Sequence, residues 1–137
     1  MTSRLNPYLT FDGNAREAME FYRSVLGGEL AVNTFDEVGN SDPALAGKVM
    51  HARLDTPEGY TLMASDTAPG MEFRPGSAIT VSLSGDTGSP LREYWEKLSD
   101  GATVDVPLEK QMWGDEFGMC VDRYGTPWMV NITQQGA

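Results

Sequence analysis

The single histidine of this chain, His51, lies in the segment KVMHARL, two residues before Arg53. Imidazole titrates near neutral pH, so His51 could act as a general base or as a hydrogen-bond donor to a ligand. The Arg53 guanidinium could hold a carboxylate or phosphate through two parallel hydrogen bonds. Each residue has a structural alternative, because a backbone group or Asp66 could satisfy His51 and an acidic neighbour could pair with Arg53. His51 is the candidate catalytic residue and Arg53 a candidate ligand contact.

Four further side chains are candidate ligand-binding groups. Tyr8 and Asn131 offer polar atoms that could line a pocket. Trp113, in the segment PLEKQMWGDEFG, could close over a bound molecule, because loops on a rigid sheet often carry binding groups. The alternative for Trp113 is packing against a partner subunit or a sheet rim. Asp66 ends the segment LMASD and could contact a ligand or cap the turn that follows.

Other reactive side chains indicate less chemistry. Met63, Met129 and Met112 suggest a soft, adaptable lining for a pocket. Cys120 is the only cysteine, so an internal disulfide is excluded and a nucleophilic dyad is disfavoured. The glycine pair after residue 26 ends a helix instead of opening one, so it does not form a phosphate-binding loop.

Short strands and two helices must position these groups. In the first half, breaker-rich segments separate expected strands at 7–11, 30–35, 48–55 and 60–65. Asn14 could cap the helix that follows the first strand, and Glu17 stands where a capping-box partner would reach back. The apolar residues of that helix recur at helical spacing: they are Ala15, Ala18, Met19, Tyr22, Val25 and Leu26.

The second half predicts the same order. Strands are expected at 77–83, 103–106, 117–122 and 126–133, and Ser89-Pro90 opens a helix between the first two. Its apolar stripe is Leu91, Tyr94, Trp95 and Leu98.

The two halves also repeat in sequence. FDGNAREAMEFYRSVLGGEL is echoed by SGDTGSPLREYWEKLSDGATV, and HARLDTPEGYTLMAS by FGMCVDRYGTPWMVN. In the second echo, Leu54-Asp55 is placed on Val121-Asp122 and Met63 on Met129. The chain is therefore predicted to be one α+β domain of two strand–helix–strand–strand–strand modules, at about 5–66 and 77–133, joined by a linker at about 67–76.

Strand alternation assigns the side chains to faces. The helix-covered face is predicted to hold Leu9, Phe11, Met50, Ala52, Leu54, Leu62, Ala64, Ile79, Val81, Leu83, Trp128 and Val130. The open face is predicted to hold Asn6, Tyr8, Thr10, Val49, His51, Arg53, Met63, Ser65, Ala78, Thr80, Ser82, Cys120, Met129 and Asn131.

The segments FDGNAREAMEFY, KVMHARL, LMASD, QMWGDEFG and DRYGTPWMVN, in this order, resemble the vicinal oxygen chelate superfamily and most closely its PhnB-like, glyoxalase/bleomycin-resistance branch. The resemblance covers nearly the whole chain. It implies a U-shaped, mainly antiparallel sheet with helices on its convex face, a ligand site on its concave face, and a homodimer. The match of KVMHARL also strengthens the case for His51.

The resemblance further implies where metal ligands would lie. Metal-dependent relatives supply His or Glu from the first and last strand of each module, because a divalent ion needs several converging ligands. The last-strand positions here carry Met63 and Met129, and the first-strand positions fall near Asn6 and near Ala78 or Ile79. We therefore expect the usual metal site to be absent and no cofactor to be bound.

Composition limits the partners. The 137 residues carry a formal charge of −10, which disfavours nucleic acid and anionic membranes as partners. Neither a secretory signal nor an apolar stretch of membrane-spanning length is visible, and the lone cysteine fits a reducing cytoplasm.

Three functions remain open at this stage. The first is a small-molecule-binding protein without the usual metal ligands, with cationic compounds suited to the acidic surface. The second is an enzyme of lyase, isomerase or dioxygenase type that uses His51 at an atypical site. The third is an interaction domain with a vestigial cavity. Some members of the branch are labelled as ubiquinone-pathway methyltransferases, but no nucleotide or methyl-donor motif is found in the sequence.

Overall fold

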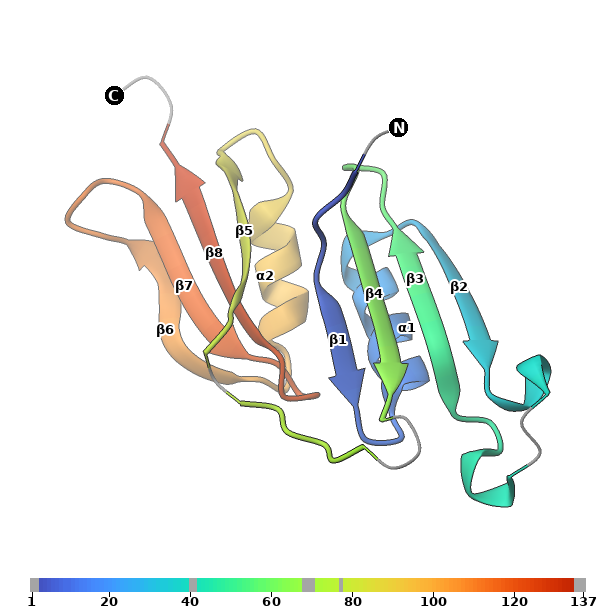
Figure 1. Ribbon diagram of the computed structural model, residues 1–137. Coiled ribbons are helices and arrows are strands. Elements are labelled where there is room, and N and C mark those ends of the chain that lie inside the picture. Colours follow the sequence, from blue (N-terminus) through green and yellow to red (C-terminus); the bar gives the residue numbers. More distant parts are fainter. Residues whose placement is uncertain (1–2, 40–41, 68–70, 77, 135–137) are drawn as a thin grey trace. The chain divides into compact units, whose positions relative to one another are not determined.

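The computed structural model describes residues 3–39, 42–67, 71–76 and 78–134. The chain divides into two compact units, Met1–Pro75 and Gly76–Ala137. Each unit is one four-stranded sheet with a helix, and both follow the order strand–helix–strand–strand–strand (Figure 1). The predicted α+β class with two such modules is confirmed.

In the N-terminal unit the strand order is β1-β4-β3-β2. Strand β1 runs parallel to β4, whereas the β2–β3 and β3–β4 pairs are antiparallel. Two 3-10 turns, Asp36–Val38 and Pro43–Leu45, lie between β2 and β3. The elements are β1 (Tyr8–Phe11), α1 (Ala15–Leu26), β2 (Glu29–Thr34), β3 (Val49–Asp55) and β4 (Thr61–Asp66).

The C-terminal unit repeats this topology with the strand order β5-β8-β7-β6. The pair β5–β8 is parallel, and the other two pairs are antiparallel. Its elements are β5 (Val81–Asp86), α2 (Leu91–Ser99), β6 (Thr103–Lys110), β7 (Glu116–Val121) and β8 (Pro127–Thr133).

Each helix lies on one face of its own sheet (Figure 1), and the side chains that it buries are those of its apolar stripe. Burying one such side chain contributes roughly 1.5–3 kcal/mol, so the stripes fix the helices in place. In the described ranges of the chain, no helix of the same unit lies on the opposite face of either sheet. The buried stripe residues are those predicted: Ala15, Ala18, Met19, Tyr22, Val25 and Leu26 in α1, and Leu91, Tyr94, Trp95 and Leu98 in α2.

The predicted open-face position of Val49 is wrong, because Val49 is completely buried. The pairing of β2 with β3 shifts between Asn33 and Thr34: Asn33 lies opposite His51, but Thr34 lies opposite Val49. Met50 is therefore the extra residue of a β-bulge, which returns Val49 to the covered face.

The prediction that Cys120 lies on the open face is also wrong. Cys120 is 1% exposed and lies opposite Trp128, which is on the covered face. The cause is the repeat alignment of the β3–β4 and β7–β8 turns. Gly59 donates its N–H to Thr56 in one turn and Gly125 donates to Asp122 in the other, so Thr56, not Asp55, corresponds to Asp122.

The strand predicted at 77–83 begins later than expected. Strand β5 starts at Val81, and Ile79, predicted to lie in the core, is 80% exposed. Leu83 is buried as predicted. None of the helices in the described part of the chain is long and apolar enough to cross a membrane.

Candidate functional site

The open face of the N-terminal unit carries a row of side chains in register across its sheet. Tyr8 lies opposite Met63, and Met63 lies opposite Arg53. His51 is two residues before Arg53 on β3, so it projects from the same face, and it lies opposite Asn33 of β2. Three of the predicted site residues, Tyr8, His51 and Arg53, therefore share this face.

Tyr8 and His51 form a hydrogen-bonded pair. The Tyr8 Oη atom lies 3.2 Å from His51 Nδ1, and the ring centroids are 5.8 Å apart. Tyr8 is 51% exposed, so the pair is open to an incoming molecule. His51 Nε2 makes no hydrogen bond to any residue that the structure describes. The pair can therefore offer Nε2 to a ligand, as a donor or as an acceptor according to the tautomer.

Arg53 adopts the structural alternative. Its Nε and Nη2 atoms donate to the two carboxylate oxygens of Asp55, at 2.9 and 3.1 Å, and Thr61 donates its hydroxyl to the same carboxylate at 3.0 Å. The Arg53 guanidinium holds the pKa of Asp55 below its ordinary value. The Arg53 side chain is 38% exposed, so it can still reach a ligand beside Asp55.

Asp66 is a structural residue of this unit. It is 2% exposed, and its two oxygens accept the backbone N–H groups of Ala15 at 2.9 Å and Val49 at 2.8 Å. The first bond caps the N-terminus of α1, where a negative charge is favourable. The second bond fixes the start of β3. Asp66 thus holds helix α1 to the sheet and stands apart from the Tyr8–His51 pair.

The remaining two predicted residues lie in the C-terminal unit. Trp113 is 59% exposed at the turn between β6 and β7, and its ring contacts Phe117 edge to face at 6.0 Å. Asn131 lies opposite Phe117, and its Nδ2 donates to Asp115 at 3.1 Å. Phe117 and Asp115 were not predicted as site residues. Counting back by two from Met119, which lies opposite Met129, would have identified Phe117.

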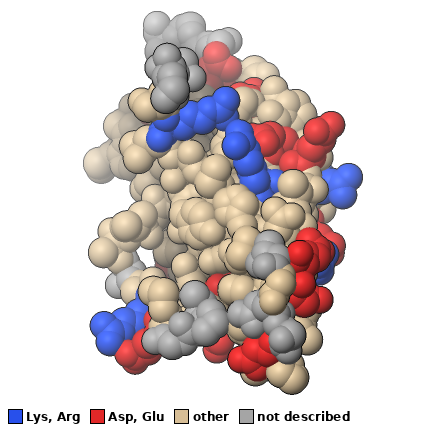
Figure 2. Space-filling view, turned by 45° about the vertical axis from the view of Figure 1, so that its right-hand side comes forward, with Lys and Arg blue, Asp and Glu red and all other residues tan. Residues whose placement is uncertain are grey.

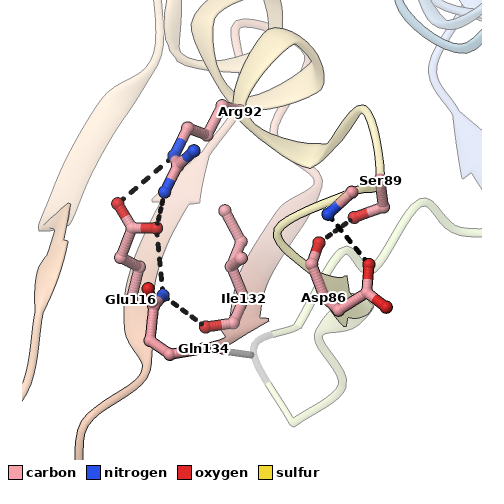
Figure 3. Close-up of polar contacts among 7 residues, drawn as sticks. Asp86, Ser89, Arg92, Glu116, Ile132 and Gln134 are labelled. Carbon is pink, nitrogen blue, oxygen red and sulfur yellow. Dashed lines mark hydrogen bonds and ion pairs between the residues drawn. The ribbon is translucent and has the colours of Figure 1, made fainter. Parts of the chain in front are cut away.

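A cavity of about 240 Å³ lies at the start of α2 in the C-terminal unit. Next to it, Arg92 pairs with Glu116, and Gln134 donates to the same carboxylate at 3.2 Å (Figure 3). The Arg92 guanidinium holds the pKa of Glu116 below its ordinary value. None of these groups was predicted. The cavity is lined by Thr87, Ser89, Pro90, Arg92, Glu93 and Ile132.

Met63 and Met129 project from the open faces of their sheets, as predicted. The register of β1 with β4 and of β5 with β8 places Tyr8 and Ser82 beside these methionines. Among the described residues, no three His, Cys, Asp or Glu side chains lie close enough together to hold a metal ion. The absence of the usual metal site stays a prediction.

These features define the class of protein. The family model described as 3-demethylubiquinone-9 3-methyltransferase matches residues 3–131. The chain belongs to this family, the PhnB-like branch of the vicinal oxygen chelate superfamily.

Solved structures agree with this assignment. The chain is 36% identical to protein PA1353 from Pseudomonas aeruginosa, with a TM-score of 0.87 over 98% of this chain and 100% of that one. It is 26% identical to a Bacillus cereus PhnB protein described as a putative 3-demethylubiquinone-9 3-methyltransferase, with a TM-score of 0.72 over 96% and 100%. A glyoxylase/bleomycin resistance protein/dioxygenase domain from Frankia shares the fold at 15% identity, with a TM-score of 0.65 over 100% and 96%.

Proposed function

We propose that this chain is a small-molecule-binding protein of the glyoxalase/bleomycin-resistance type. The observation that carries this proposal is the Tyr8–His51 pair beside Met63 on the open face of the N-terminal sheet. Converging polar groups beside an adaptable thioether side chain are typical of small-molecule sites.

The proposed binding needs no metal at the positions that metal-dependent relatives use. Those positions carry Met63 and Met129, and thioethers are poor ligands for the hard divalent ions that carboxylates and imidazoles hold. Ligand binding is therefore expected to be unchanged in excess chelator. Tight, near-stoichiometric Ni, Zn or Fe in freshly purified protein would contradict this part of the proposal.

The test is a ligand screen by saturation-transfer NMR against small molecules of all charge types. A ligand of the Tyr8–His51 pair should bind several-fold more weakly to Tyr8→Phe and to His51→Ala. Tyr60→Phe is the matched control, because Tyr60 lies at the β3–β4 turn of the same unit. Equal affinity in Tyr8→Phe, His51→Ala and wild type would place the ligand elsewhere.

The second candidate is a metal-independent or atypical-site enzyme of lyase, isomerase or dioxygenase type. The open Nε2 of His51 favours it, because a Tyr8 hydroxyl donating to Nδ1 would orient the ring for proton transfer. In that case His51→Ala should abolish turnover, and unchanged turnover would discard the hypothesis. The methyl transfer named in the family description can be checked by titration with S-adenosylmethionine.

We also propose a cytoplasmic homodimer that binds neither nucleic acid nor membrane. The homodimer rests on the resemblance to the superfamily. A reducing compartment suits Cys120, which is a buried free thiol. Light scattering at micromolar concentration tests the dimer, and a monomer would refute it.

A further inference from the structure

We propose that the open face of the C-terminal sheet around Trp113 and Phe117 binds an organic cation. This inference rests on the proposed small-molecule function and names the ligand class. We call this surface the cation-binding face, and its residues are Trp113, Phe117, Met119, Met129, Glu109, Asp115 and Asn131.

The aromatic part of the cation-binding face is held by a tight turn. Gln111 donates its N–H to Asp115 at 2.8 Å, and Gly114 donates to Gln111 at 3.0 Å. This turn exposes the Trp113 indole, and the edge-to-face contact with Phe117 sets its orientation. Indole and phenyl faces attract cations within about 6 Å of the ring centroid, and tryptophan does so best.

The surface beside the aromatic rings is apolar and soft. Met119 is two residues beyond Phe117 on β7 and lies opposite Met129 of β8, so the two thioethers adjoin the phenyl ring on the same face. Both methionines are partly exposed. A ligand with an alkyl or aromatic body could cover them while its charged end meets the indole.

The charged side chains of the cation-binding face are both acidic. Glu109 lies opposite Phe117, and the side-chain carboxylate of Asp115 accepts the neutral amide of Asn131. In the described part of the chain, neither carboxylate has an ion-pair partner. A cation seated on the rings would therefore meet two carboxylates without competition.

The basic residues of this unit project elsewhere. Arg92 pairs with Glu116, and Arg123 pairs with Asp100. Lys97 is on the exposed side of α2. Lys110 lies opposite Glu116, and since neighbouring strand residues alternate, it points away from the face that carries Glu109. The negative charge of the cation-binding face thus complements a positive ligand and repels an anion. The wider surface carries an excess of Asp and Glu over Lys and Arg, part of which is visible in Figure 2.

The test uses benzyltrimethylammonium as the cationic probe and benzenesulfonate as an anion of similar size. Intrinsic fluorescence reports on the site, because Trp113 is exposed whereas Trp95 and Trp128 are buried. We expect a saturable change with the cation only, weakened by added salt. Trp113→Phe should remove the fluorescence change and weaken binding about threefold by ligand-detected NMR.

Charge-neutralising variants locate the site. Glu109→Gln and Asp115→Asn should each weaken binding of the cation about 2- to 5-fold. Glu96→Gln is the matched control, since it removes one exposed charge from α2 of the same unit. Equal losses in Glu96→Gln would show that only net charge matters and would overturn the proposal.

The outcome also separates this inference from the proposed function. Suppose that the ligand screen yields only neutral or anionic compounds whose binding depends on Tyr8 and His51. That result would refute the binding of a cation at the cation-binding face and would leave the proposed small-molecule function intact. Equal fluorescence responses to benzyltrimethylammonium and benzenesulfonate, or no response to the cation, also overturn the inference. A cation that binds Glu109→Gln about 2- to 5-fold more weakly than wild type, and binds Glu96→Gln as tightly as wild type, supports both proposals.

Discussion

Replacing Asp66 tests whether this residue is a structural carboxylate. Its two oxygens accept the buried N–H groups of Ala15 and Val49, and no water can substitute for them at 2% exposure. A hydrogen bond to a charged acceptor contributes about 1.5–3 kcal/mol. In Asp66→Asn one bond is retained, but the amide NH₂ group faces the other N–H. We expect a loss of about 3 kcal/mol of unfolding free energy for Asp66→Asn and about 4 kcal/mol for Asp66→Ala.

The assay combines urea unfolding, followed by circular dichroism, with amide hydrogen exchange. All three tryptophans lie in the C-terminal unit, so their fluorescence does not report on the unit that contains Asp66. The exchange of the Ala15 and Val49 amides should accelerate the most, because these groups lose their acceptor. Asp12→Asn, an exposed carboxylate just before α1, controls for charge near the helix start.

The result that would refute this reasoning is specific. If Asp66→Asn is as stable as wild type, within about 0.5 kcal/mol, and the two amides keep their protection, the hydrogen bonds do not hold the unit together. If stability is retained but a ligand of the Tyr8–His51 pair is lost, Asp66 is a binding residue, as the sequence allowed.

Three further predictions concern packing. Burial raises the pKa of the Cys120 thiol from its ordinary 9.0 to about 11, so the contribution of this thiol to stability should be constant below pH 9 and fall by about 2 kcal/mol by pH 11. In urea titrations Cys120→Ala should remove this part of the decline, and an equal decline in variant and wild type would contradict it. Trp128→Phe should cost about 2 kcal/mol, because the indole N–H donates to buried Asp122 at 2.8 Å, and a neutral effect in thermal unfolding would argue against that bond. Gly28→Ala should destabilise by roughly 3 kcal/mol, since Gly28 has a φ of +105° and a Cβ there would lie 2.0 Å from the Asp55 carbonyl oxygen; full expression with unchanged melting temperature would disprove this.

The fold was largely predictable because both modules carry strong periodic signals. The stripes of α1 and α2 follow helical spacing without interruption, and β4 and β8 alternate cleanly between covered and open faces. The same rule of alternation places Tyr8 of β1, His51 of β3 and Asn131 of β8 on the open faces, in agreement with the observed register. Local sequence was sufficient here, because periodicity is set by the element itself.

The errors have a different origin. Val49 was misplaced by a β-bulge, which inserts one residue and inverts the alternation before it. Cys120 was misplaced because two unlike residues, Thr56 and Asp122, occupy the same turn position, so the repeat was aligned one residue out. Both errors are single-residue shifts, and in a strand a single-residue shift moves a side chain to the other face.

The corrected register shows that the two modules bury their carboxylates at different places. Asp66 corresponds to Ile132, since Phe11 lies opposite one and Gly85 opposite the other in equivalent strand pairs. In the N-terminal unit the buried carboxylate at this position caps the helix. In the C-terminal unit the buried carboxylate is instead Asp122, whose side-chain oxygens accept hydrogen bonds from Tyr124, Thr126 and Trp128.

The difference between Asp66 and Ile132 at equivalent positions has a consequence for α2. Ile132 offers no side-chain oxygen to the first turn of α2, and its side chain lines the 240 Å³ cavity at that helix end. In the C-terminal unit the buried carboxylate lies at the β7–β8 turn and not at the helix start, and Asp122 there accepts the indole N–H of the buried Trp128. Strands β7 and β8, which this turn joins, also carry Phe117 and Asn131 of the proposed cation site.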